Sequence, residues 1–149
     1  MKIWIDADAC PKAAKEIIFR AAIRTQTQLT LVANHLSQIP TSKFINMIIV
    51  ANGFDEADKR IEAECTSGDL VITGDIPLAS LVVAKGCIAL NTNGTIYTKA
   101  TIQQQLAVRN LMAQLRDQQL VSGGPSSYGT SQVKSLAMQL DKLLAQRTT

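Results

Sequence analysis

The first 98 residues alternate short apolar segments with segments of helical periodicity, and this alternation restricts the fold more than any other feature of the sequence. The apolar segments, rich in β-branched residues, predict five strands at residues 2–6, 29–34, 46–51, 70–74 and 87–91. Helices are predicted between them at 11–24, 54–65 and 77–85. This order predicts an α/β fold with a mostly parallel central sheet and helices on both faces. The composition of 46–51 further predicts a strand that is buried on both faces.

The last third of the chain has a different character. Asn93-Gly94, flanked by β-forming residues, predicts a small β-hairpin. A long helix is predicted at 99–120, and its inward residues are expected to be Ile102, Leu106, Leu111 and Leu115. A Gly/Ser loop at 122–131 and an amphipathic helix at 132–147 follow. We therefore predict a single domain over 1–149, with an α/β core and hairpin at 1–98 and a C-terminal helical part at 99–149.

The composition is that of a globular protein and predicts no membrane-spanning helix. The chain has 149 residues, 46% hydrophobic and 18% charged, and a net charge of +3, as expected for a globular protein that can contact phosphates. The sequence contains no signal-peptide pattern and no apolar run long enough for a membrane helix, so we expect a cytoplasmic protein without a membrane partner. The three cysteines are an odd number without CxxC spacing, which favours reduced thiols over disulfides or zinc. The oligomeric state is left open.

Aspartates follow three of the predicted strands at the point where each strand ends. Asp6 and Asp8 follow the first strand, Asp55 and Asp58 follow the third, and Asp75 follows the fourth. In open parallel sheets the ligand crevice lies beyond the carboxyl ends of the strands, where the strand order reverses. The sequence therefore predicts that these five carboxylates meet at one edge of the sheet.

Two interpretations of this acidic edge are open. Asp8, Asp55 and Asp75 each also fit a helix N-cap, which favours aspartate. Capping does not require both Asp6 and Asp8, however, and two carboxylates about 4 Å apart repel by roughly 4 kcal/mol at an effective dielectric constant near 20. A divalent cation relieves this repulsion, and Mg²⁺ or Mn²⁺ prefers hard oxygen ligands. We therefore predict a Mg²⁺ or Mn²⁺ site built from the five aspartates.

Several ordered motifs resemble the YaiI/YqxD family of uncharacterised bacterial proteins. They are "IWIDADACP", "GFDEADKRI", "GDLVITGDIPLA", "KGCIALNTNGTIYT", "LAVRNLMAQLR" and "GGP". That family looks like a branch of the PIN and NYN nuclease-like domains, so the resemblance implies a PIN-like three-layer fold. It also implies Mg²⁺- or Mn²⁺-dependent cleavage of RNA phosphodiester bonds. The catalytic and metal-binding roles carry over to Asp6, Asp58 and Asp75, with Asp8 and Asp55 in support.

The sequence departs from the NYN pattern in one place. NYN domains usually have Asp-x-Asp-Phe where this chain has Asp75-Ile-Pro-Leu, so the second acid of that motif is absent. A PIN-like module that binds RNA or protein without cutting it is therefore a real alternative. An Asp-x-Asp phosphatase is a lesser one, because its motif expects Thr or Val at Cys10 and a further acid shortly after Asp75. Cys10 itself is expected to be an inert thiol.

Phosphate contacts are predicted for basic residues near the same edge. Lys12, Lys15 and Arg109 are the candidates for substrate binding, although exposed basic residues on helices commonly interact only with solvent. Thr73 is a candidate for orienting a water or a phosphate oxygen, and its alternative role is that of an ordinary strand residue. Aromatic residues make up 4% of the chain, so no base-stacking platform is expected, and Tyr128 is the aromatic considered for base contact.

Overall fold

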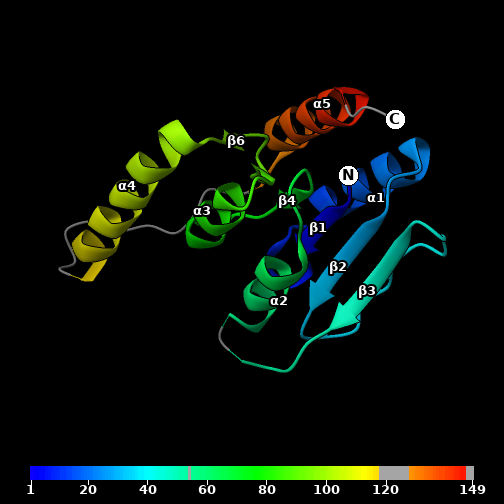
Figure 1. Ribbon diagram of the computed structural model, residues 1–149, viewed down its shortest axis with the longest axis horizontal. Helices are drawn as coiled ribbons and strands as arrows, with labels where there is room; N and C mark the ends of the chain where they lie inside the picture. Colours follow the sequence, from blue (N-terminus) through cyan, green and yellow to red (C-terminus); the bar gives the residue numbers. More distant parts are fainter. Residues whose placement is uncertain (54, 118–127, 147–149) are drawn as a thin grey trace.

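A six-stranded sheet forms the centre of the protein (Figure 1). The structure is a computed structural model that describes residues 1–53, 55–117 and 128–146. The strands are β1 (Ile3–Asp6), β2 (Leu29–Ala33), β3 (Ile45–Ile49), β4 (Leu70–Ile72), β5 (Ile88–Leu90) and β6 (Ile96–Tyr97). Their spatial order is β3-β2-β1-β4-β5-β6. Every neighbouring pair is parallel except β5 and β6, which are antiparallel. The predicted mostly parallel sheet with a small hairpin is therefore confirmed.

Helices cover both faces of this sheet and make the fold three-layered (Figure 1). They are α1 (Lys12–Thr25), α2 (Glu56–Glu64), α3 (Ile76–Ala84), α4 (Lys99–Asp117) and α5 (Thr130–Gln146), with a short 3₁₀ turn, η1 (Ala7–Ala9), after β1. Successive strand residues point to opposite faces. Ile3 and Ile5 accordingly lie in the core with α1 and α5, whereas Trp4 lies in the core with α2 and α3. The predicted α/β class with C-terminal helices is confirmed.

The strand order reverses between β1 and β4. The chain builds β1, β2 and β3 outward in one direction, and then returns to place β4 on the other side of β1. Ligand sites in such sheets lie at this reversal, beyond the carboxyl ends of the strands. Asp6 is the last residue of β1, and Asp75 follows β4, so both lie at the reversal.

The prediction of a strand buried on both faces at 46–51 is wrong. β3 lies at the edge of the sheet, where it pairs with β2, and Ile45 is its one buried residue. Ile49 at its far end is 45% exposed. An apolar composition identifies a strand, but the composition of one strand does not tell whether it lies at the centre or the edge.

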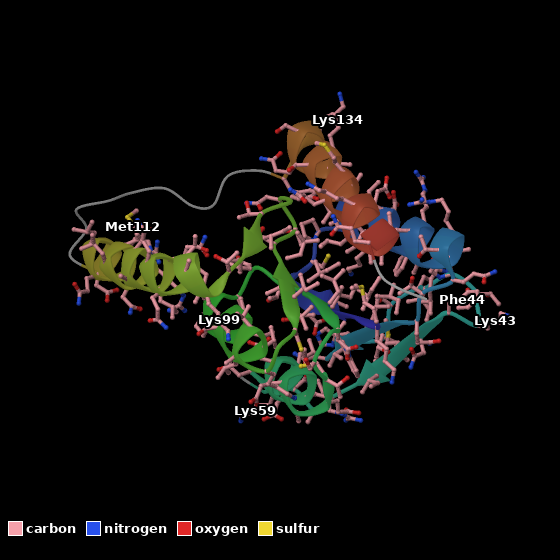
Figure 2. The ribbon with its side chains drawn as sticks, turned by 45° about the horizontal axis from the view of Figure 1, so that its top comes forward. Lys43, Phe44, Lys59, Lys99, Met112 and Lys134 are labelled. Atoms are coloured by element: carbon pink, nitrogen blue, oxygen red, sulfur yellow. The ribbon has the colours of Figure 1, made fainter. Side chains whose placement is uncertain are left out.

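The inward face predicted for the long helix is also partly wrong. Ile102 is buried, but Leu106 and Leu115 are half-buried and Leu111 is 53% exposed. α4 contacts α3 and extends away from the rest of the molecule, with Met112 on its projecting part (Figure 2). At 100° per residue, Leu111 and Leu115 lie on the side of α4 opposite Ile102 and Leu106, so the four predicted residues do not form one inward face.

Hydrogen bonds from the hairpin stabilise the start of the C-terminal region. Gly94 has φ +93°, and its N–H donates to the Asn91 carbonyl at 2.9 Å, as the predicted Asn-Gly hairpin requires. The Tyr128 hydroxyl donates to the Thr92 carbonyl at 2.7 Å, and its ring packs against the core. A contact between Tyr128 and a base stays a prediction. Most of the predicted loop at 122–131 lies outside the described residues. No helix within the described part of the chain is long and apolar enough to cross a membrane.

Candidate functional site

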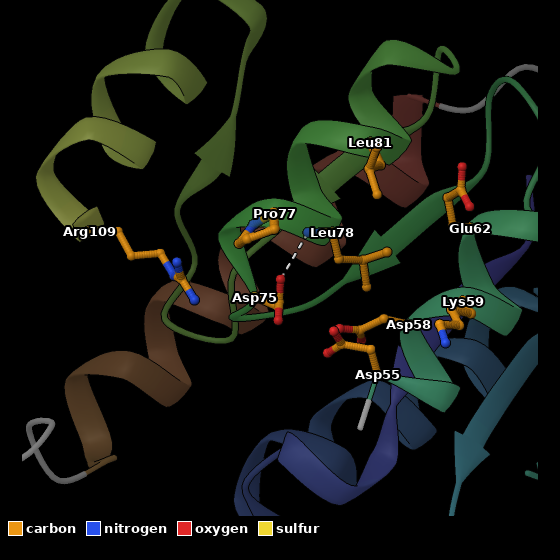
Figure 3. Close-up of a pocket in the computed structure, with 9 residues that line it drawn as sticks. All are labelled: Asp55, Asp58, Lys59, Glu62, Asp75, Pro77, Leu78, Leu81 and Arg109. Atoms are coloured by element: carbon orange, nitrogen blue, oxygen red, sulfur yellow. Dashed lines mark hydrogen bonds between the residues drawn. The ribbon is translucent and has the colours of Figure 1, made fainter. Parts of the chain in front are cut away.

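The five predicted aspartates lie together at the carboxyl ends of β1 and β4. Asp6, Asp8, Asp55, Asp58 and Asp75 all line a pocket of about 180 Å³. The last three also line an adjoining pocket of about 310 Å³, which Figure 3 shows between α2, α3 and α4. The structure thus brings all five side chains to the edge that the sequence indicates. Their roles in metal binding and catalysis remain predictions.

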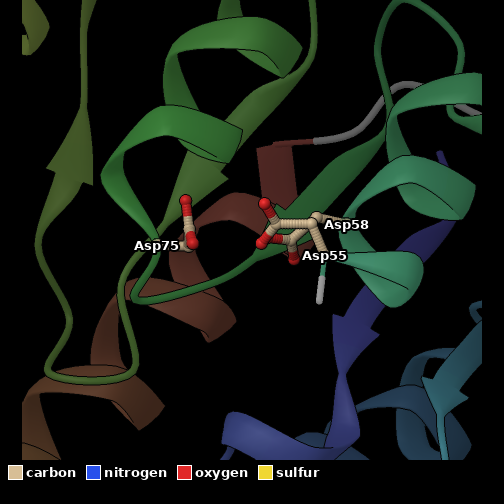
Figure 4. A group of neighbouring side chains, drawn as sticks. All are labelled: Asp55, Asp58 and Asp75. Carbon is tan, nitrogen blue, oxygen red and sulfur yellow. The ribbon is translucent and has the colours of Figure 1, made fainter. Parts of the chain in front are cut away.

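Three of the carboxylates form the closest group. One oxygen from each of Asp55, Asp58 and Asp75 lies within 4.8 Å of the other two (Figure 4). At that separation each charged pair repels by about 3 kcal/mol at an effective dielectric constant near 20. Two oxygens bound to one Mg²⁺ at about 2.1 Å are at most about 4.2 Å apart, so a side-chain shift of less than about 1 Å suffices for direct binding. The donor set therefore fits a hard divalent cation.

Asp58 lies at the centre of this electrostatic crowding. Its Oδ1 is buried and has no hydrogen-bond partner among the described residues. Burial, followed by the negative charges of Asp75 and Asp6, raises the pKa of Asp58 to about 7. The closeness of the Asp75 carboxylate and the charge of Asp55 act in the same direction. Asp58 is therefore the group of this site for which a proton or a cation is most favourable.

Asp6 and Asp8 line the smaller acidic pocket together with Asp58. Burial and the charge of Asp8 raise the pKa of Asp6, while the backbone N–H groups of Asp8 and Ala9 partly offset this effect. Asp8 is exposed, and its Oδ2 accepts a 2.6 Å hydrogen bond from the backbone N–H of Asn34, just beyond β2. Asp6 therefore faces the carboxylate group directly, whereas Asp8 also ties β1 to the end of β2.

Of Asp8, Asp55 and Asp75, which all fit a helix N-cap by sequence, only Asp75 caps a helix through its side chain. Asp75 is the N-cap of α3, where its Oδ1 accepts a 2.9 Å hydrogen bond from the N–H of Leu78. Asp55 precedes α2 but makes no side-chain cap hydrogen bond, and its φ of 64° is left-handed. Such a conformation costs of order 1 kcal/mol for a residue with a Cβ. Asp8 bonds to Asn34 instead of capping a helix.

Thr73 holds the aspartate loop in place. Its side chain is 4% exposed, and its Oγ1 accepts a 2.9 Å hydrogen bond from the backbone N–H of Asp75. Thr73 is not among the residues that line the two acidic pockets. The structure therefore supports a positioning role for Thr73 through Asp75, and a direct contact with substrate stays a prediction.

The predicted basic residues fall into two groups. Arg109 reaches from α4 to the pocket that contains Asp75, and Figure 3 shows its guanidinium on the same side as that carboxylate. Lys12 and Lys15 lie at the start of α1, outside the lining of both acidic pockets.

Burial raises the pKa of the Cys10 thiol to about 12, although Lys15 acts in the opposite direction. Such a thiol is a poor nucleophile, in agreement with the inert role expected for Cys10.

Sequence reasoning missed three polar residues at this edge. Asn34 lines the smaller acidic pocket, and its Oδ1 is buried without a hydrogen-bond partner among the described residues. Asn91 donates a 2.6 Å hydrogen bond from Nδ2 to the hydroxyl of Tyr97, whose pKa is raised by burial and, to a lesser extent, by Asp75. Asn34 and Asn91 are the last residues of two predicted strands. The rule that ligand sites lie beyond the carboxyl ends of parallel strands would therefore have found them as well as the aspartates.

Comparison with known proteins identifies relatives over almost the whole chain. Residues 4–146 match the model of a family described as "Uncharacterized BCR, YaiI/YqxD family". A UPF0178 protein of Maridesulfovibrio salexigens is 52% identical over 144 residues, which cover 97% of this chain and 95% of that protein. A UPF0178 protein of Dechloromonas aromatica is 51% identical, and the match covers 97% of each chain. A UPF0178 protein of Pseudoalteromonas atlantica is 50% identical, and the match covers 99% of this chain and 100% of that protein. No solved structure matches this chain.

Proposed function

We propose a function from the chemistry of the acidic site, because this chain belongs to the YaiI/YqxD family and that family is described as uncharacterised. The proposed function is hydrolysis of RNA phosphodiester bonds with the help of Mg²⁺ or Mn²⁺. The observation that carries it is the group formed by Asp55, Asp58 and Asp75, whose oxygens lie within 4.8 Å of one another. The resemblance of the sequence motifs to PIN and NYN domains supports the same reaction.

The residues that would hold the ion are the same three aspartates. The buried, unpartnered Oδ1 of Asp58 supports this assignment, because a buried acceptor without a donor is destabilising unless a cation or a proton reaches it. Asp6 and Asp8 line the smaller pocket beside Asp58 and would complete a second group of ligands. When bound, such an ion supplies a more acidic water and neutralises the charge that develops on phosphorus.

The remaining steps belong to side chains of this protein. Asp6 would bind the ion through one carboxylate oxygen and accept the proton of the attacking water at the other. The guanidinium of Arg109 would pair with a non-bridging oxygen of the phosphate. Asp75 would keep its orientation during the reaction because Leu78 and Thr73 hold its carboxylate and its backbone.

A second candidate function is binding of RNA without cleavage. The observation that favours it is the absence of the second acid of the NYN motif after Asp75. Pro77 occupies the position of that acid, and Leu78 after it is 2% exposed in the core. A phosphatase with an Asp6-x-Asp8 motif is a further alternative, and it would act on small phosphomonoesters.

Cleavage of a labelled single-stranded RNA with and without Mn²⁺ tests the proposal. We expect cleavage that requires the ion and that decreases by about 100-fold or more in Asp58→Asn and Asp75→Asn. Asp141→Asn is the matched control, because Asp141 is an exposed aspartate on α5 paired with Arg24. Cleavage that persists in both site variants contradicts the proposal. Binding without cleavage supports the second candidate, and turnover of a small phosphomonoester with intact RNA supports the phosphatase.

A further inference from the structure

A third hollow lies along α4 and adjoins the acidic site. Its volume is about 550 Å³, and its lining consists of Ile76, Thr101, Gln104, Gln105, Val108, Arg109, Met112 and Arg116. Arg109 also lines the pocket that contains Asp55, Asp58 and Asp75. The two cavities therefore share one side chain, and an extended ligand at the aspartates would enter the α4 hollow after passing Arg109. Figure 3 shows Arg109 at the margin of the acidic pocket.

The lining of the α4 hollow combines an apolar floor with polar groups. Val108 is 54% exposed, and Ile76 and Met112 are half-buried, so the floor is open to a ligand. Gln105 contributes an Oε1 that is buried and has no hydrogen-bond partner among the described residues. An apolar surface with a hydrogen-bonding edge is what a flat heterocyclic ring such as a nucleobase requires.

Two arginines give the same hollow a positive charge. Arg109 and Arg116 are seven residues apart on α4, which places them on one face of the helix and about 10 Å apart along its axis. The ion pairs within the described residues involve other side chains, and no carboxylate is among the lining residues of the hollow. The guanidinium groups therefore remain available to an anionic ligand, and a phosphate is the anion that matches their geometry.

We propose that the α4 hollow is a subsite for an unpaired nucleotide of the RNA strand, next to the phosphate that reacts at the acidic site. This inference rests on the proposed function for the identity of the strand. The charge of Arg109 and Arg116 and the continuity with the acidic pocket select this occupant. A base must leave the helical stack to reach the apolar floor, so the substrate class is single-stranded RNA and not duplex. The hollow has no aromatic lining residue, so phosphate contacts dominate and sequence preference is weak.

The test measures binding of a fluorescently labelled single-stranded RNA of about 12 nucleotides in the presence of EDTA. We expect Arg116→Ala to weaken binding about fivefold and to reduce the salt dependence by about 0.7 in the slope of log K against log salt. Met112→Asp introduces a negative charge into the hollow and is expected to weaken binding by about tenfold. Arg116→Lys keeps the charge and should bind nearly as the parent does. Arg20→Ala, which removes an exposed arginine on α1, is the matched control.

The outcomes separate this inference from the proposed function. If the parent, Arg116→Ala and Met112→Asp bind RNA equally tightly and cleave it equally well, the subsite proposal is contradicted. The nuclease proposal then still stands. RNA that is bound through Arg116 and Met112 but never cleaved supports the subsite and contradicts the nuclease. Equal affinity for duplex RNA overturns the subsite. A parent dimer that becomes a monomer in Met112→Asp also overturns it, because the hollow is then an interface between two copies.

Discussion

Replacing Asp58 by asparagine tests the electrostatic basis of the site. Asp58 has a pKa of about 7 in the folded protein, against a model-compound value of 3.8. The folded state therefore binds this proton more tightly than the unfolded state, and the free energy of unfolding falls as the pH rises from about 4 to about 7. The destabilisation is complete above about pH 7 and absent below about pH 4. Asp58→Asn removes the charge while keeping a side chain of similar size.

The pKa and the burial of Asp58 set the expected change in the free energy of unfolding. A difference of about three between the two pKa values corresponds to about 4 kcal/mol if the group is fully shielded from solvent. Asp58 is half-buried, so solvent screening reduces this value, and we expect a gain of about 2 kcal/mol for Asp58→Asn at about pH 8. For a chain of this size, such a gain raises Tm by about 6 °C.

Thermal unfolding followed by circular dichroism in EDTA measures this effect. The Tm of Asp58→Asn should exceed that of the parent at about pH 8, and the difference should shrink toward zero as the pH approaches about 4. Added Mn²⁺ should raise the Tm of the parent and have little effect on the variant, because binding to the folded state alone is stabilising. Asp141→Asn, which removes an exposed ion-pair partner of Arg24, should change Tm little at any pH in this range.

A specific result would refute the reasoning. If Asp58→Asn melts at the same temperature as the parent or lower at about pH 8, the charged form of Asp58 is not destabilised by burial and by the neighbouring carboxylates. If Mn²⁺ also leaves the parent unchanged, the aspartates at this edge do not form a cation site.

Two further variants test other parts of the structure. Thr73→Val removes the oxygen that accepts the N–H of Asp75, so we expect RNA cleavage to fall by about tenfold with little change in KM, while Thr73→Ser retains activity. Gly94→Ala should lower Tm more than Gly68→Ala does, although both glycines have φ near +90°. A Cβ at Gly94 would collide with Ser135 on α5, whereas a Cβ at Gly68 meets no atom within 4 Å. Thermal unfolding of both variants measures the difference, and an equal loss in Tm would mean that the hairpin does not pack against α5 as described.

Features that depend on near neighbours in the chain could be predicted from the sequence alone. The spacing of apolar residues located five strands and the helices between them, because side-chain direction repeats every two residues in a strand and every 3.6 in a helix. The rule for parallel sheets then assigned Asp6, Asp8, Asp55, Asp58 and Asp75 to one edge, and they line one pocket there. Asn93-Gly94 predicted the hairpin for the same local reason.

Features that depend on contacts between distant segments were decided by the tertiary structure. The sequence did not show that β3 is an edge strand or that the face of α4 around Leu111 is left partly uncovered, because both follow from the placement of other elements. Nor did it show that the charges of Asp75, Asp6 and Asp55 all act on Asp58. Arg109 lines the acidic pocket because α4 packs against α3. Local periodicity determines each element, whereas strand order and helix packing determine which side chains meet.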